Sequence, residues 1–203
     1  DSAFQNSGQV CIAMKRLYVH DSIYDEVVDE LASIANDTII GDGLEQGTKL
    51  GPLQNKMQYE KVKELIESAR QDGNIVAGGE VPDQSGYFIR PTIVRDVTEG
   101  SRIVDEEQFG PVLPVIRFSD ESDAIARANN SDYGLGGSVW SSDLDRAYDV
   151  ANQMNTGTVW INKHAELDPG IPFGGSKQSG LGNELGMEGL KEFTQLKMIN
   201  MAR

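Results

Sequence analysis

The residue with the clearest chemical potential is Cys11, the only cysteine among 203 residues. A thiolate is a nucleophile that adds to carbonyl carbons, and the oxyanion that results needs nearby N–H donors. Glycine and small polar residues crowd the run Phe4-Gln-Asn-Ser-Gly-Gln-Val-Cys11, where the backbone can approach a reacting carbonyl. We expect Cys11 to lie at a loop–helix junction, which favours a thiolate. The alternative is a small, buried, inert side chain.

Other cysteine and metal chemistries have less support. A cysteine protease needs a base, and neither His20 nor His164 is close to Cys11 in the sequence. The two histidines also lack metal-ligand spacing, so no metal site is predicted. A single cysteine cannot form an internal disulfide, which is typical of a reducing cytoplasm.

The composition argues against two classes of partner. The net charge of −14 argues against a nucleic acid or an anionic membrane as the partner. No apolar run approaches the roughly 18 to 20 residues that a membrane span requires. We therefore expect a cytoplasmic protein.

Strand and helix patterns alternate along the chain. Helices are predicted to begin near Ser22, Lys56, Asp120 and Ser142. The second is expected to bury Val62, Leu65, Ile66 and Ala69, and the fourth to turn Leu144 inward. Strands are predicted at 16–19, 75–77, 88–94, 112–118, 135–140 and 158–162. This order predicts an α/β fold with a mostly parallel sheet and helices on both faces. One more strand is predicted at 193–201, free to pair with another edge.

Four ordered motifs resemble those of the NAD(P)-dependent aldehyde dehydrogenase superfamily. Residues 4–11 are similar to its cysteine signature, and Glu106-Glu-Gln-Phe-Gly-Pro-Val112 is similar to its Glu-x-Phe-Gly-Pro segment. Residues 130–136 resemble its Asn-x-x-x-Tyr-Gly-Leu segment, and 172–182 resemble its Pro-Phe-Gly-Gly-x-Lys-x-Ser-Gly-x-Gly run. The resemblance covers essentially the whole chain and implies the catalytic-domain fold of that family.

The resemblance implies a role for each matched residue. Cys11 takes the position of the nucleophile that forms a thiohemiacetal and then a thioester with an aldehyde. Residues expected to bind the NAD or NADP cofactor are Glu107, Phe109 and Gln58, with Lys61 as a further candidate. Residues expected to line the substrate tunnel are Val10, Ile12, Leu167 and Phe173. The stretch 162–169 has no arginine to clamp a carboxylate, so a neutral or apolar aldehyde is expected.

The resemblance also implies a division of the chain and what lies outside it. Residues 1–192 would form the catalytic domain, and 193–203 an oligomerisation strand of a homodimer or homotetramer. The family's general base, a glutamate before the cysteine, and most cofactor contacts have no counterpart in the sequence. The isolated chain is therefore predicted to be inactive in aldehyde oxidation. The alternatives are an acylating, coenzyme A-dependent enzyme and a non-catalytic assembly module of the same fold.

Overall fold

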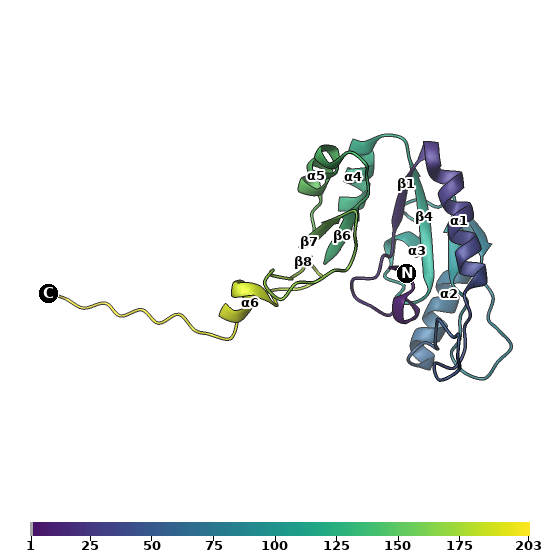
Figure 1. The fold of residues 1–203 in the computed structure, drawn as a ribbon, viewed down its shortest axis with the longest axis horizontal. Coiled ribbons are helices and arrows are strands. Elements are labelled where there is room, and N and C mark those ends of the chain that lie inside the picture. The colour runs from purple at the N-terminus through teal and green to yellow at the C-terminus, as the bar shows by residue number, and fades with distance from the viewer. Residues whose placement is uncertain (1) are drawn as a thin grey trace. The chain divides into compact units, whose positions relative to one another are not determined.

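The computed structural model describes residues 2–203, and Asp1 lies outside the described part. The chain forms two compact units, divided between Arg127 and Ala128 (Figure 1). We call them unit 1 and unit 2 and describe each by itself. The predicted boundary between residues 192 and 193 is a functional one and stays a prediction.

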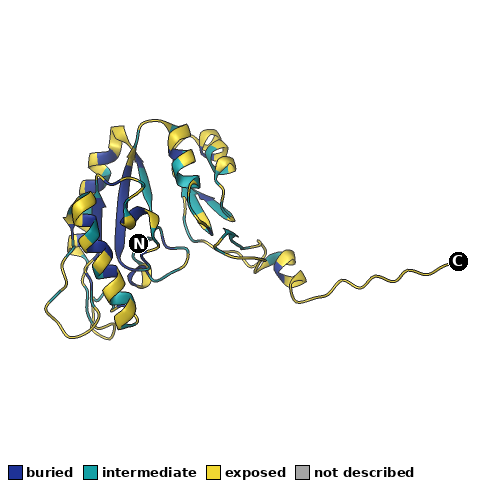
Figure 2. Cartoon of the chain, turned by 180° about the vertical axis from the view of Figure 1, so that it is seen from behind, coloured by how far each residue is buried: buried dark blue, intermediate teal, exposed yellow. Residues whose placement is uncertain are grey.

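Unit 1 is built on a four-stranded sheet with the order β1-β4-β3-β2. β1 (Leu17–His20) and β3 (Thr92–Arg95) both run parallel to the central strand β4 (Val112–Phe118). β2 (Asn74–Ala77) pairs antiparallel with β3 at one edge. The sheet is mixed and mostly parallel, so the α/β prediction is confirmed. β4 has the predicted bounds, and Figure 2 shows it as the buried centre of the unit.

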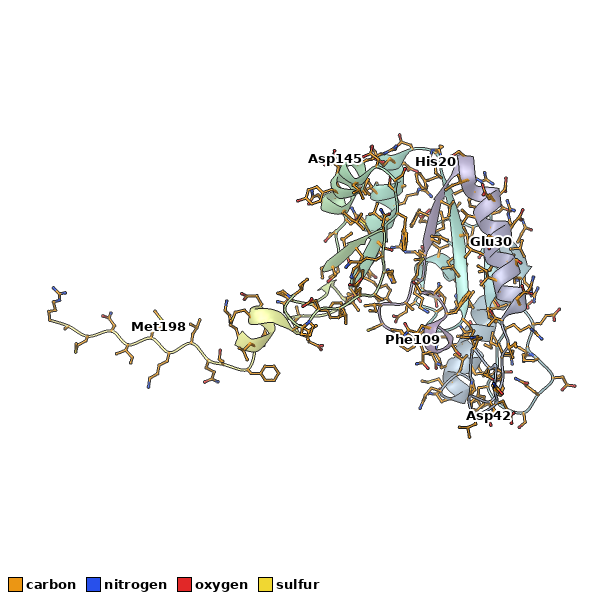
Figure 3. The ribbon with its side chains drawn as sticks, viewed as in Figure 1. His20, Glu30, Asp42, Phe109, Asp145 and Met198 are labelled. Atoms are coloured by element: carbon orange, nitrogen blue, oxygen red, sulfur yellow. The ribbon has the colours of Figure 1, made fainter. Side chains whose placement is uncertain are left out.

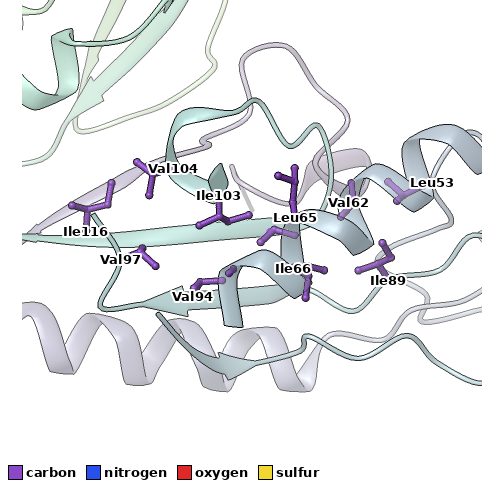
Figure 4. Close-up of a cluster of buried hydrophobic side chains, with 12 residues drawn as sticks. Leu53, Val62, Leu65, Ile66, Ile89, Val94, Val97, Ile103, Val104 and Ile116 are labelled. Carbon is purple, nitrogen blue, oxygen red and sulfur yellow. The ribbon is translucent and has the colours of Figure 1, made fainter. Parts of the chain in front are cut away.

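Helices cover both faces of this sheet. Successive residues of β4 point to opposite faces because the side chains of a strand alternate. Val112 and Ile116 pack in one core cluster with α2 (Lys56–Asp72) and α3 (Arg102–Asp105), which Figure 4 shows in close-up. Leu113 and Val115 belong to a second cluster, on the side of α1 (Tyr24–Asp37). The expected helix–sheet–helix layering is confirmed within this unit.

The helix starts test the predicted caps. α2 begins at Lys56 as predicted, after Asn55, whose side chain accepts a hydrogen bond from the N–H of Gln58. Its buried face is the predicted one, made of Val62, Leu65, Ile66 and Ala69. The predicted cap at Ser22 is wrong, because Ser22 lies in the short 3₁₀ helix η2 (Asp21–Ile23), which delays α1. There the Ser22 N–H donates to the His20 ring instead.

Unit 2 contains two small two-stranded sheets. β6 (Gly136–Val139) runs parallel to β7 (Thr158–Ile161), and β5 (Tyr133–Gly134) pairs antiparallel with β8 (Ser176–Lys177). Its helices are α5 (Leu144–Gln153) and α6 (Gly186–Lys191), while α4 (Glu121–Asn129) spans the boundary with unit 1. The α5 cap is Asp143 rather than the predicted Ser142, and Leu144, predicted to face inward, is 62% exposed.

The C-terminal segment after α6 is extended and exposed (Figure 1). Residues 193–201 pair with no described strand, and the predicted pairing of this segment with another chain stays a prediction. Five large apolar side chains are nevertheless more than four-fifths exposed there, and Met198, labelled in Figure 3, is one of them; they are Phe193, Leu196, Met198, Ile199 and Met201. No helix within residues 2–203 has the length and apolar character to cross a membrane.

Candidate active site

Cys11 lies on a tightly turned loop, residues 5–12, which we call the cysteine loop. It opens with the 3₁₀ helix η1 (Gln5–Gly8), in which Asn6, Ser7 and Gly8 all have positive φ, at 49°, 55° and 75°. Left-handed backbone at non-glycine residues is costly and clusters at functional sites. Cys11 follows η1 in a turn, and its side chain is exposed.

Cys11 is exposed in the described chain, so it is not the buried side chain of the alternative. The prediction of a loop–helix junction is also wrong, because the chain continues from Cys11 toward the strand β1, and the first α-helix begins only at Tyr24. A run of left-handed residues, Asn6 to Gly8, precedes Cys11 where a helix start was predicted. Any N–H donors beside the sulfur therefore come from loop backbone and not from a helix end.

Three contacts hold the cysteine loop in this shape. The buried Ser7 hydroxyl donates to the Gly51 carbonyl at 2.7 Å, and the Gln54 N–H donates to the side chain of Gln9 at 2.8 Å. The Lys15 ammonium donates to the Gly8 carbonyl at 2.5 Å, closing a ring of backbone around Cys11. Val10 and Ile12, the predicted tunnel residues beside Cys11, are half-buried.

Glu107 and Phe109 lie on a second loop, residues 106–110, which we call the acidic loop. It joins α3 to β4, and the buried Gln108 side chain anchors it by donating to the Ile103 carbonyl. Glu107 is exposed, and within residues 2–203 no hydrogen bond or ion pair engages its carboxylate. Phe109 has a φ of 48°, a second left-handed non-glycine residue of the kind found in the cysteine loop.

Helix α2 fixes the backbone of the acidic loop. The Gln58 amide donates to the carbonyl oxygens of Gln108 and Phe109, at 2.7 and 3.0 Å, and the Lys61 ammonium donates to that of Glu107 at 2.8 Å. These contacts leave the Glu107 carboxylate free to accept hydrogen bonds. The Gln58 and Lys61 side chains therefore hold the loop, and their predicted contacts with a cofactor stay predictions.

The cysteine loop and the acidic loop touch each other. A Cβ atom placed on Gly8 would lie 2.1 Å from the carbonyl oxygen of Gly110, so only glycine permits this approach. Lys15 also reaches across, with its Nζ 3.3 Å from the same Gly110 oxygen. Lys15 is not among the predicted site residues, because its partners are backbone carbonyls that no motif marks.

The remaining predicted site residues belong to unit 2. Leu167 is 47% exposed and follows β7, and Phe173 is half-buried. The backbone of Phe173 pairs with that of Glu184 through two hydrogen bonds of 2.7 Å. Their proximity to Cys11 in unit 1 stays a prediction.

The two histidines have structural partners. The His20 ring lies 2.8 Å from the Ser22 hydroxyl and stacks edge-on against Phe118. His20 pairs with Phe118 at the C-terminal end of β4, whereas Phe109 precedes its N-terminal end, and Figure 3 labels the two residues well apart, so His20 is remote from the acidic loop. His164 lies in unit 2, 3.2 Å from the Ser138 hydroxyl. Within residues 2–203, no cluster of three or more His, Cys, Asp or Glu side chains could hold a metal ion.

The fold and the site define an α/β protein that presents an exposed thiol and an unengaged carboxylate on two adjoining loops. The pattern of one known family matches residues 1–199, and its description is "Aldehyde dehydrogenase family". The chain belongs to the aldehyde dehydrogenase family.

Named relatives agree with this assignment. The chain is 46% identical over 195 residues to a succinate-semialdehyde dehydrogenase [NADP(+)] of Deinococcus radiodurans, covering 96% of the chain and 41% of the relative. It is 42% identical over 202 residues to a phenylacetaldehyde dehydrogenase of Pseudomonas fluorescens, covering 98% and 40%. A solved NAD+ complex of an aldehyde dehydrogenase from Bacillus cereus superposes with a TM-score of 0.92 at 43% identity, covering 97% and 41%. The chain thus spans about two fifths of the length of these relatives.

Proposed function

We propose that the protein to which this chain belongs is an NAD(P)-dependent aldehyde dehydrogenase that oxidises an aldehyde to a carboxylate through Cys11. The observation that carries the proposal is the exposed Cys11 thiol on a strained loop that touches the loop of Glu107 and Phe109. Family membership and the NAD+ and NADP(+) in the names of similar proteins support the same reaction class.

Cys11 performs the covalent chemistry. Its sulfur adds to the aldehyde carbon, and the resulting thiohemiacetal oxygen is stabilised by backbone N–H donors of the cysteine loop. Loss of hydride from that carbon leaves a thioester on Cys11. Water then releases the carboxylate and returns the thiol, a step that needs a general base. No residue of this chain matches the family's base by motif, so the base is expected in another part of the protein.

The acidic loop fits one end of a nicotinamide cofactor. When bound, the cofactor supplies the acceptor for the hydride. The Glu107 carboxylate is exposed and unengaged in the described residues, and an ionised carboxylate can accept hydrogen bonds from two ribose hydroxyls at once. Gln58 and Lys61 keep the backbone beneath it in place. Phe109 offers an aromatic ring on the same loop.

A neutral or apolar aldehyde is the proposed substrate class. The proposed lining residues, Val10, Ile12, Leu167 and Phe173, are apolar, and no arginine stands in the stretch 162–169. Sequence identity alone does not choose the substrate. Of the two relatives above, one is named for phenylacetaldehyde and the other for succinate semialdehyde, which carries a carboxylate.

The assembly and location of the protein are also proposals. The exposed apolar side chains of residues 193–203 support pairing of this segment with another subunit, in a homodimer or homotetramer. Sedimentation of the full-length protein with and without residues 193–203 tests this, and an unchanged mass would contradict it. A cytoplasmic location is supported by the single, unpaired cysteine.

The experiment that tests the proposed reaction uses the full-length protein, a set of neutral and carboxylate-bearing aldehydes, and NAD or NADP. Absorbance measures the reduced cofactor, and NMR identifies the product. We expect carboxylate and reduced cofactor in equal amounts, with no need for coenzyme A. Turnover only with coenzyme A would establish the acylating alternative. No reduced cofactor with any aldehyde would contradict the proposal and favour a non-catalytic assembly role.

A further inference from the structure

We propose that Lys15 is a positioning residue that holds the cysteine loop and the acidic loop in a fixed position relative to each other. The inference rests on the proposed function, because it concerns how the thiol and the cofactor-binding carboxylate are held at a working separation. Lys15 is not one of the residues that the family resemblance singled out. Its role follows from its contacts in unit 1.

The Lys15 ammonium binds one carbonyl from each loop. Its Nζ lies 2.5 Å from the Gly8 oxygen and 3.3 Å from the Gly110 oxygen, although Lys15 and Gly110 are 95 residues apart in the chain. An ammonium has three donors and no acceptor, so it can bond to two carbonyl groups at once. Hydrogen bonds from a charged donor are roughly twice as strong as neutral ones. The side chain therefore acts as a direct link between the loops.

The backbones of the two loops are in direct contact at Gly8 and Gly110. Gly8 and Gly110 approach without any side chain between them, and a Cβ atom on Gly8 would lie 2.1 Å from the Gly110 oxygen and 3.0 Å from Lys15 Nζ. The Lys15 ammonium attracts the negative ends of both carbonyl dipoles and so opposes separation of the two backbones. A neutral side chain of similar length lacks this charge.

The linked carbonyls lie close in sequence to the reactive groups. Gly8 is three residues before Cys11, and Gly110 is three residues after Glu107. The Lys15–Gly8 bond closes a ring of backbone that contains Cys11, so movement of the ring moves the sulfur. A shift of either loop changes the separation between the sulfur and the carboxylate. Errors of about 1 Å in the placement of reacting groups can cost about 10²-fold in rate.

The surroundings of Lys15 differ from those of a solvated surface lysine. Lys15 is half-buried, and burial lowers the pKa of its ammonium to about 8, while the negative charge of Glu107 opposes that shift. A lysine that served only for solubility would keep its ammonium in water. Lys49, which is exposed and has no side-chain hydrogen bond among the described residues, has the opposite environment and provides the matched control.

The test compares Lys15→Met, Lys15→Arg and the control Lys49→Met in the full-length protein, below its unfolding temperature. For Lys15→Met we expect kcat to fall by about 10²-fold with little change in the KM for the aldehyde, because binding survives and alignment is lost. Lys15→Arg should recover part of kcat because it keeps the charge and the donors. Lys49→Met should behave as wild type. An unchanged kcat in Lys15→Met, or an arginine variant no better than the methionine variant, would overturn the proposal.

A second measurement separates this proposal from the proposed reaction. Amide hydrogen exchange of Lys15→Met should speed up together in residues 5–12 and 106–110, while helix α1 keeps its protection. If the wild-type protein oxidises no aldehyde, the proposed function fails, and only the exchange measurement then tests the role of Lys15. In that case, Lys15→Met exchange rates equal to wild type in both loops would contradict the proposal.

Discussion

Gly8 and Gly110 lie backbone to backbone, so close that a Cβ atom on Gly8 would be 2.1 Å from the Gly110 carbonyl oxygen. The contact joins the loop of the candidate nucleophile to the loop of the candidate cofactor-binding carboxylate. Gly8 also has a φ of 75°, which disfavours any side chain. Unit 1 therefore couples the two halves of the proposed site through a single glycine contact and the lysine beside it.

The first prediction concerns this contact. Gly8→Ala should lower kcat/KM of the full-length protein by about 10²-fold or more, because the new methyl group must push the loops apart. Gly100→Ala is the control, since Gly100 also has a positive φ, of 93°, but open space around it. It should cost about 1–2 kcal/mol of stability from backbone strain alone and leave kcat/KM close to wild type. Equal kinetic effects of the two substitutions would contradict the contact.

The second prediction is a pH dependence of stability. The folded-state pKa of Lys15 is about 8, below its ordinary value of 10.5. Between these values the unfolded chain binds more protons than the folded one, so Lys15 makes the free energy of unfolding rise with pH. Urea denaturation of wild type and Lys15→Met from pH 7 to 11 should show wild type gaining stability relative to the variant between about pH 8 and 10.5. A constant difference would mean that Lys15 is not desolvated.

The third prediction separates two neighbouring acids. Glu107→Gln should raise the KM for the cofactor by about 10- to 10²-fold, the loss expected for hydrogen bonds to a charged acceptor. Glu106→Gln is the control, because the Glu106 carboxylate pairs with Arg102. Steady-state kinetics with varied cofactor should show a cofactor KM near wild type for Glu106→Gln. A larger rise in the cofactor KM for Glu106→Gln than for Glu107→Gln would contradict the assignment of Glu107 as the cofactor-binding carboxylate.

The fourth prediction tests the support beneath the acidic loop. Gln58→Glu replaces a donor with a carboxylate facing the carbonyl oxygens of Gln108 and Phe109. Two partners lose their hydrogen bonds and face a charge, so the free energy of unfolding should fall by about 1–3 kcal/mol. Gln58→Ala should fall less, because it adds no repulsion. Urea denaturation measures both, and a glutamate variant as stable as wild type would show that these bonds contribute little.

Much of unit 1 could be predicted because its pattern is regular. The buried face of α2 follows helical spacing, so Leu65 was correctly expected inside. The apolar run 112–118 was correctly expected to form a strand, which is β4. The predictions were wrong where the local geometry is irregular. The predicted cap of α5 was wrong by one residue, because Ser142 and Asp143 are both residue types that cap helices. In the structure the Arg146 N–H donates to the Asp143 side chain.

The candidate site was only partly predictable. Motif matches identified Cys11 and Glu107, yet no pattern indicates that Asn6 and Ser7 adopt left-handed backbone, which is why a helix was expected after Cys11. Lys15 was missed because its partners are backbone carbonyls, one of them 95 residues away. A hydrogen bond between a side chain and a distant backbone carbonyl produces no pattern in the spacing of residues along the sequence.

The most direct test of the central claim is to identify the acylated residue. Full-length protein mixed with an aldehyde and cofactor would be quenched in acid within one turnover, digested, and analysed by mass spectrometry. The proposed reaction predicts an acyl adduct on the peptide that contains Cys11, and neither adduct nor turnover in Cys11→Ser. An adduct on another residue, or undiminished turnover in Cys11→Ser, would contradict it.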